Sequence, residues 1–174
     1  MKHFATVLVV LLALTTLASA QQAITPQAPQ TIPNPRFVCN ARYSLQRCHE
    51  QVAVLRSVLD KYRAQQLVHW TWVLVRSEDW KPILLARRLD PDSPAFSFLE
   101  KRQTFIEEAL LTDNVQRRRV ELLKKWELPL DGLLELAVTH ELGHALCNTR
   151  DEANADRYGK ALREGKPAVC EVRK

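Results

Sequence analysis

The stretch "HELGH", His140 to His144, places two histidines four residues apart with a glutamate directly after the first. On an α-helix, residues four apart project side by side, so His140 and His144 can present two imidazole nitrogens to one cation. Glu141 is offset by one position and can reach a water bound to that cation. The pattern therefore predicts a zinc site with Glu141 beside the metal-bound water.

A second acidic motif follows, since "EANAD" runs from Glu152 to Asp156. Together the two motifs resemble the gluzincins, the thermolysin-like metallopeptidases in which HExxH precedes a glutamate ligand in an E-x-x-A-D pattern on a second helix. The resemblance extends from His140 to Asp156. It implies that His140, His144 and Glu152 bind Zn²⁺ and that Glu141 is general base and proton shuttle. It also implies that Asp156 orients a ligand histidine by accepting from its far N–H.

The third ligand has an alternative. Only seven residues separate His144 from Glu152, a shorter interval than gluzincins commonly have. Asn148 tolerates the left-handed conformation that ends a helix, so the chain can reverse there. If Thr149 then caps the second helix with Glu152 as its capping-box partner, Asp156 becomes the better ligand candidate. The family pattern favours Glu152.

Metzincin spacing is absent. That pattern demands glycine three residues and histidine or aspartate six residues after the second motif histidine, and these positions hold Cys147 and Arg150. Cys147 lies about 10 Å along the helix from His140, so we expect a disulfide or a buried thiol there rather than a zinc ligand.

The resemblance implies hydrolysis of a peptide bond in a peptide or protein substrate, with the metal activating the attacking water. An extended substrate would pair with an edge strand, for which "RQTFIEE", residues 102–108, is the candidate. His69 and Tyr62 are candidate donors to the oxyanion. The alternative is a binding module without catalysis, stabilised by zinc or held by disulfides.

The composition is that of one exported globular domain. The chain has 174 residues, of which 46% are hydrophobic and 26% charged. Residues 1–20 have a positive start, an apolar run and a small-x-small ending at Ala20, which predicts a secretory signal peptide. The run is shorter than the roughly 20 residues of a membrane helix, so we expect a periplasmic or secreted chain without stable membrane insertion.

Charge and cysteine content narrow the partners and the compartment. Cleavage removes Lys2 and leaves a net charge of +4, and the basic run at 117–119 has no interleaved aromatic residues, so we expect no nucleic acid partner. The sequence does not define an oligomeric state. Four cysteines in the exported part, an even number, predict two disulfides.

Disulfide connectivity depends on where the first helix begins. Cys39 and Cys48 can pair if Ser44 is the helix cap, but not if Asn40 opens the helix, because helical rise then separates their Cα atoms too far. Four cysteines allow three connectivities, and the choice among them stays open at this point.

The sequence patterns around these residues predict an α+β fold that is mostly helical. Residues 21–36 contain four prolines and four glutamines, which indicates a flexible tether before a metallopeptidase-like domain at 37–174. We expect a long helix ending near Gln66, then a small β-hairpin or sheet from 67–75 and 80–88. Three further helices complete the prediction: one over 113–127, the active-site helix starting at Asp131, and a short helix carrying "EANAD".

Overall fold

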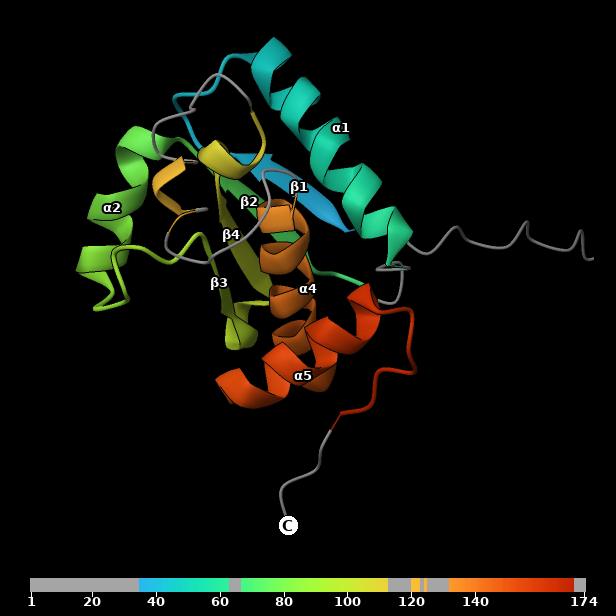
Figure 1. Ribbon diagram of the computed structural model, residues 1–174. Helices are drawn as coiled ribbons and strands as arrows, with labels where there is room; N and C mark the ends of the chain where they lie inside the picture. The colour runs from blue at the N-terminus through green and yellow to red at the C-terminus, as the bar shows by residue number, and fades with distance from the viewer. Residues whose placement is uncertain (1–34, 63–66, 113–119, 123, 125–131, 171–174) are drawn as a thin grey trace, which may run out of the picture. The chain divides into compact units, whose positions relative to one another are not determined.

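A computed structural model describes residues 35–62, 67–112, 120–122, 124 and 132–170. They form an α+β domain with helices on both faces of a small sheet, which confirms the predicted fold class (Figure 1). The predicted signal peptide, the tether as far as residue 34 and most of the helix predicted for 113–127 lie outside the described residues.

Four strands form one mixed sheet in the order β1 (Arg36–Cys39), β2 (Thr71–Val75), β4 (Gln103–Glu107) and β3 (Ala95–Phe98). β1, β2 and β4 run parallel, whereas β3 is antiparallel to β4. Among the described residues, β3 therefore has a paired neighbour on one side only. The edge strand predicted at 102–108 is wrong, because that segment contains β4, which lies between β2 and β3.

Strand alternation sends side chains to two separate hydrophobic clusters. One lies on the face covered by α1 (Leu45–Lys61) and α4 (Gly132–Cys147), and from the strands it contains Trp72, Leu74, Ala95 and Ile106. The other lies on the face covered by α2 (Ser77–Ala86), and from the strands it contains Val73, Val75, Phe96, Phe98 and Phe105. Position parity thus decides which strand residues can face α4.

The second hairpin strand predicted at 80–88 is wrong, because residues as far as Ala86 belong to α2. Trp80 and Leu84 are four residues apart and only 1% and 0% exposed, which is the spacing of one buried helix face. Pro82 lies inside this helix and removes one backbone hydrogen bond. Burial of the two large side chains against the sheet outweighs that loss.

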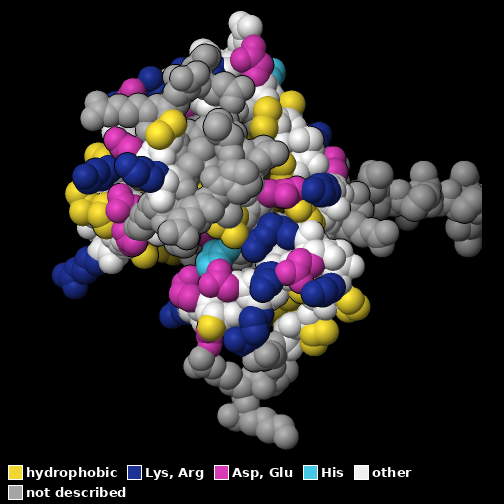
Figure 2. Space-filling view, in the orientation of Figure 1, with side chains coloured by type: hydrophobic (Ala, Val, Ile, Leu, Met, Phe, Trp, Pro, Cys, Tyr) yellow, Lys and Arg dark blue, Asp and Glu magenta, His cyan; other side chains and the backbone are white. Residues whose placement is uncertain are grey.

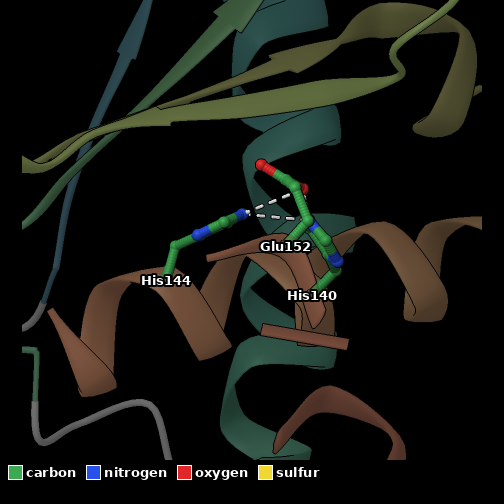
Figure 3. Close-up of side chains that lie close together, drawn as sticks. All are labelled: His140, His144 and Glu152. Atoms are coloured by element: carbon green, nitrogen blue, oxygen red, sulfur yellow. Dashed lines mark hydrogen bonds and ion pairs between the residues drawn. The ribbon is translucent and has the colours of Figure 1, made fainter. Parts of the chain in front are cut away.

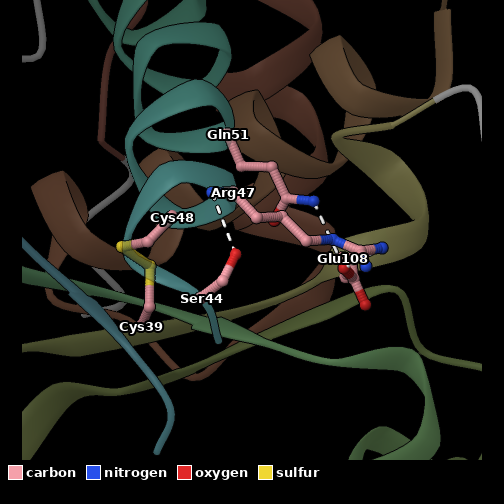
Figure 4. The surroundings of a disulfide bond; sticks show 6 residues. All are labelled: Cys39, Ser44, Arg47, Cys48, Gln51 and Glu108. Atoms are coloured by element: carbon pink, nitrogen blue, oxygen red, sulfur yellow. Dashed lines mark hydrogen bonds and ion pairs between the residues drawn. A yellow bond between two sulfur atoms is a disulfide. The ribbon is translucent and has the colours of Figure 1, made fainter. Parts of the chain in front are cut away.

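The predicted long helix is α1, and Ser44 is its N-cap. The Ser44 hydroxyl accepts a hydrogen bond from the Arg47 backbone N–H at 3.3 Å. Of the two possible starts, the Asn40 alternative is therefore wrong. With the Ser44 cap, Cys39 at the end of β1 and Cys48 in the first turn of α1 form a disulfide with Cα atoms 6.0 Å apart (Figure 4).

The second disulfide joins Cys147, the last residue of α4, to Cys170. Of the two states expected for Cys147, a disulfide or a buried thiol, the disulfide is the one formed. Both expected disulfides are present, and they are consistent with an extracellular protein. In the part of the chain that the structure describes, no helix combines the length and the apolar character needed to cross a membrane.

The last helix, α5 (Glu152–Arg163), packs against α4 at short range because a glycine stands at each contact (Figure 1). A Cβ added to Gly143 of α4 would lie 2.5 Å from the Ala155 carbonyl oxygen. A Cβ added to Gly159 of α5 would lie 2.7 Å from the Thr139 carbonyl oxygen. Ordinary carbon contacts need about 3.5 Å or more, so neither position accommodates a side chain.

Gly159→Ala tests this close packing through the sign of the change in the free energy of unfolding. In an ordinary helix interior, alanine is more favourable than glycine by about 0.8–1.0 kcal/mol. Here we expect the free energy of unfolding to fall by about 1–3 kcal/mol, because the new methyl group overpacks the α4 backbone. Urea denaturation of the metal-free protein with intact disulfides measures it.

Lys160→Ala is the matched control for that measurement. Lys160 is the next residue of α5, and its side chain is 71% exposed. We expect a change within about 0.5 kcal/mol for this surface substitution. A Gly159→Ala variant as stable as the wild type, or more stable, would contradict the packing described.

Candidate metal site and cleft

Two histidines on successive turns of α4 form the first half of the site. His144 is buried at 7% exposure, and His140 is half-buried. Their Nε2 atoms lie 3.0 Å apart, so both rings point at the same place. This follows from their four-residue spacing on a regular helix, as the sequence predicted.

Glu152 completes the group from the start of α5. The chain reverses at Asn148, whose φ of 46° is the left-handed conformation expected there. Asp151 is the N-cap of α5, and its side chain accepts from the Asn154 backbone N–H at 3.2 Å. The alternative in which Thr149 caps this helix is therefore wrong, since the Thr149 hydroxyl accepts from the Asp151 N–H instead. Glu152 is thus the first residue of α5.

The three side chains converge on one point (Figure 3). The Glu152 Oε2 atom lies 3.1 Å from His140 Nε2 and 3.5 Å from His144 Nε2. Zinc-to-ligand distances of about 2.0–2.2 Å in tetrahedral geometry place ligand atoms roughly 3.3–3.6 Å apart. His140, His144 and Glu152 could therefore hold a metal ion with little rearrangement.

The outer nitrogen of each imidazole has an acceptor that fixes its tautomer. Asp156 Oδ1 lies 2.7 Å from His140 Nδ1, and the Thr149 carbonyl oxygen lies 2.8 Å from His144 Nδ1. A carboxylate and a carbonyl can only accept, so each Nδ1 carries a hydrogen, which leaves Nε2 of each ring as the atom that would bind a metal. Asp156 thus lies behind His140 and does not join the group that Glu152 completes.

Glu141 lies on the side of α4 that faces the sheet. Its side chain is buried, with 3% of the residue exposed, and its Oε2 atom accepts a hydrogen bond from the Ser97 hydroxyl at 2.6 Å. Burial raises the pKa of the Glu141 carboxyl to about 7, while the Ser97 hydrogen bond and the charge of His144 lower it and the Glu152 charge raises it. A cation held at the neighbouring site would lower this pKa further.

A cleft of about 610 Å³ opens over these groups, and both β3 and α4 line it. His140, Glu141, His144 and Glu152 all face this cleft, together with apolar side chains that include Leu89, Pro94, Leu99 and Leu136. In the space-filling view of Figure 2, a patch of histidine, in cyan, is visible near the centre beside a group of acidic side chains, in magenta. The group that could hold a metal ion, the Glu141 carboxyl and a surface able to hold a ligand therefore lie together.

An exposed ion pair joins two further residues of the cleft wall. Glu100, just after β3, pairs with Arg150 in the connection between α4 and α5. Exposed pairs of this kind contribute about 1 kcal/mol at most, so this one does not hold the cleft shut against a ligand.

Two residues predicted to stabilise an oxyanion are misplaced for that role. Tyr62 packs in the hydrophobic core at the end of α1, and His69 is exposed in the turn before β2. Neither lines the cleft. Ser97 and the Thr149 carbonyl contact site residues but were not predicted. The alternation of β3 is a signal for Ser97, whereas a backbone carbonyl leaves none in the sequence.

Substitution of the acidic residues tests the ligand assignment. We expect Asp156→Asn to weaken zinc binding by about 10–100-fold, because it replaces the charged acceptor of His140 Nδ1 with a neutral amide oxygen and leaves all three ligand atoms in place. Glu152→Gln should weaken binding by more than that, because it replaces an anionic ligand oxygen with a neutral amide oxygen that binds zinc more weakly. Competition for zinc with a chromophoric chelator measures both affinities.

Glu164→Gln is the control, since Glu164 stands at the opposite end of α5 and pairs with Lys166. Its zinc affinity should equal that of the wild type. If Asp156→Asn abolished binding while Glu152→Gln preserved it, the roles of the two acidic residues would have to be exchanged.

Comparison with protein-family models, with curated proteins and with solved structures gives no match for this chain. The resemblance to a known family therefore rests on the two local motifs between His140 and Asp156 alone. What supports a function is the chemistry of the described residues and their placement around the cleft.

Proposed function

We propose that this chain is an exported zinc metallopeptidase of the gluzincin type. The observation that carries the proposal is the position of Glu141. Its carboxyl group is buried, and it lines the same cleft as the metal group formed by His140, His144 and Glu152. A general base beside a metal group is the arrangement that hydrolysis needs and that a purely structural metal site does not need.

Zinc is the metal that the donor set favours. Two imidazole nitrogens and one carboxylate are common ligands of catalytic zinc, and three protein ligands leave a coordination position open. Structural zinc sites are instead closed by four protein ligands. The group found among the described residues has three members. Glu152 lines the cleft, and 76% of its side chain is exposed. The zinc-stabilised binding module is therefore the weaker reading.

In the proposed mechanism, the ion would supply the Lewis acidity that polarises a substrate carbonyl and acidifies a water. Glu141 takes the proton of the attacking water and then delivers it to the leaving amine. The Ser97 hydroxyl engages Oε2, which leaves the second carboxylate oxygen for this transfer. As ligands, His140 and His144 would direct Nε2 at the ion, and their rings are oriented through Asp156 and the Thr149 carbonyl.

The edge strand β3 is the proposed docking site for the substrate backbone. Its pairing with β4 occupies one edge, and its residues line the cleft beside α4. An extended peptide can add to an unpaired strand edge through main-chain hydrogen bonds. Such a peptide would pass over the metal group, so its carbonyl would be presented to His140, His144 and Glu152. Apolar side chains in the cleft wall favour apolar substrate residues.

Glu141→Gln tests the proposed function. We expect the variant to bind one equivalent of zinc like the wild type and to lose about 10²–10⁴-fold in cleavage rate, because an amide cannot accept the proton. A quenched fluorescent peptide library, incubated with the full zinc-loaded chain, measures cleavage. Glu164→Gln, at the far end of α5, should cleave at the wild-type rate.

Two outcomes would count against this function. Retained cleavage in Glu141→Gln would remove the general base from the mechanism. A wild-type protein that holds zinc at this site yet cleaves no member of the library would favour the binding module.

A further inference from the structure

Three consecutive hydrogen bonds run through the sheet and end on Glu141. The Trp70 indole N–H donates to the Thr104 hydroxyl at 3.0 Å. The Thr104 and Ser97 hydroxyl oxygens lie 2.7 Å apart, and Ser97 donates to Glu141 Oε2 at 2.6 Å. The chain begins just before β2, crosses β4 and β3, and ends on α4.

The two ends of this chain fix the direction of every hydrogen in it. An indole N–H can only donate, so Thr104 accepts from Trp70. Ser97 directs its single hydrogen at Glu141. The hydrogen between the two hydroxyl oxygens therefore belongs to Thr104, which donates to Ser97. All the donors therefore point toward the carboxylate, which is the polarity that stabilises a negative charge there.

Sheet register places these hydroxyls on a face that is otherwise apolar. Ser97 and Thr104 are directly paired across β3 and β4, and they share strand parity with Ala95 and Ile106 of the hydrophobic cluster. Thr104 is 0% exposed and Trp70 is 5% exposed. Buried hydroxyls cost free energy unless they are hydrogen-bonded, and valine would fill the Thr104 position without that cost. The pair is therefore explained by what it holds, the Glu141 side chain.

We propose that Ser97 is a positioning residue for Glu141 and that Thr104 and Trp70 fix the orientation of its hydroxyl. The inference rests on the proposed function, because it assigns Ser97 a part in the same reaction. Ser97 holds Oε2 against the sheet and so fixes which carboxylate oxygen faces the cleft. It does so from β3, the strand proposed to dock the substrate, so base and substrate are aligned by one element.

Kinetics of the full zinc-loaded chain test the positioning role. We expect Ser97→Ala to lower kcat by about 10–100-fold, since a hydrogen bond to a charged group is lost, while KM changes little. Ser97→Thr retains the hydroxyl and should restore most of kcat. Thr104→Val leaves Ser97 able to donate but frees its orientation, so its loss of kcat should be smaller. Zinc content should equal that of the wild type throughout.

Ser57→Ala is the matched control, because Ser57 is an exposed serine of α1 that donates to the Val54 carbonyl. Its kcat and KM should not change. If Ser97→Ala lowered zinc content, or raised KM at constant kcat, the positioning role would be overturned in favour of a structural or substrate-binding one.

A second measurement does not need activity. In ¹H–¹⁵N spectra, we expect the Trp70 indole resonance to move upfield in Ser97→Ala and in Glu141→Gln, because its hydrogen bond is no longer reinforced along the chain. Trp80 donates to the Ser93 carbonyl at 2.7 Å and is the internal control, so its resonance should stay in place. The Trp70 signal is assigned by its loss in Trp70→Phe.

The two measurements separate the failure of this inference from the failure of the proposed function. An inactive wild type would contradict the function alone, and the spectra would still support or overturn the hydrogen-bonded chain. A Trp70 resonance unmoved in both variants would overturn the chain, whatever the enzymatic activity.

Discussion

The close packing of α4 against α5 is the constraint on which the candidate site depends. Two glycines, Gly143 and Gly159, let each helix approach the backbone of the other to a distance that no side chain permits. Only at this separation does the first residue of α5 reach the two imidazoles of α4. The disulfide from Cys147 to Cys170 ties the end of α4 to the segment after α5, so it restrains the helix pair as a unit.

Side chains from neighbouring positions of α4 contact two different elements, α5 and the sheet. The histidine side faces α5 and its acidic residues, whereas Glu141 faces the sheet and Ser97. The same helix therefore couples the metal group to the edge strand β3 without any further element. Burial on both sides is tolerated because each polar group has a partner: Glu141 is held by Ser97, and each Nδ1 hydrogen has an oxygen acceptor.

The part of the site that the sequence predicts is the part set by helical periodicity. The spacing of His140 and His144 is set within about one helical turn, where local rules suffice. Glu152 was expected instead from the E-x-x-A-D pattern, and the packing of α5 on α4 brings it to the histidines. The cap of α5 escaped prediction because Thr149 and Asp151 are both good caps, and tertiary contacts select between them. The α+β class was predictable because helices and strands each leave a periodic pattern of apolar residues in the sequence.

The sheet was harder to predict because its order depends on pairings between distant segments. No local pattern says that β4 is interior and β3 is the edge, and the apolar run with Pro82 has features of both strand and helix. Ser97 and Thr104 acquire their place beside Glu141 only through that register. Residues brought together by the sheet were therefore missed, whereas residues brought together by one helix were found.

Anomalous diffraction at the zinc edge, from crystals of the full chain grown with zinc, is the most direct test of the central claim. We predict one peak within about 2.0–2.2 Å of His140 Nε2, His144 Nε2 and a Glu152 oxygen, with no fourth protein ligand. A peak on other residues, a fourth protein ligand closing the site, or no zinc at all would contradict the account of this protein as a catalytic metal centre.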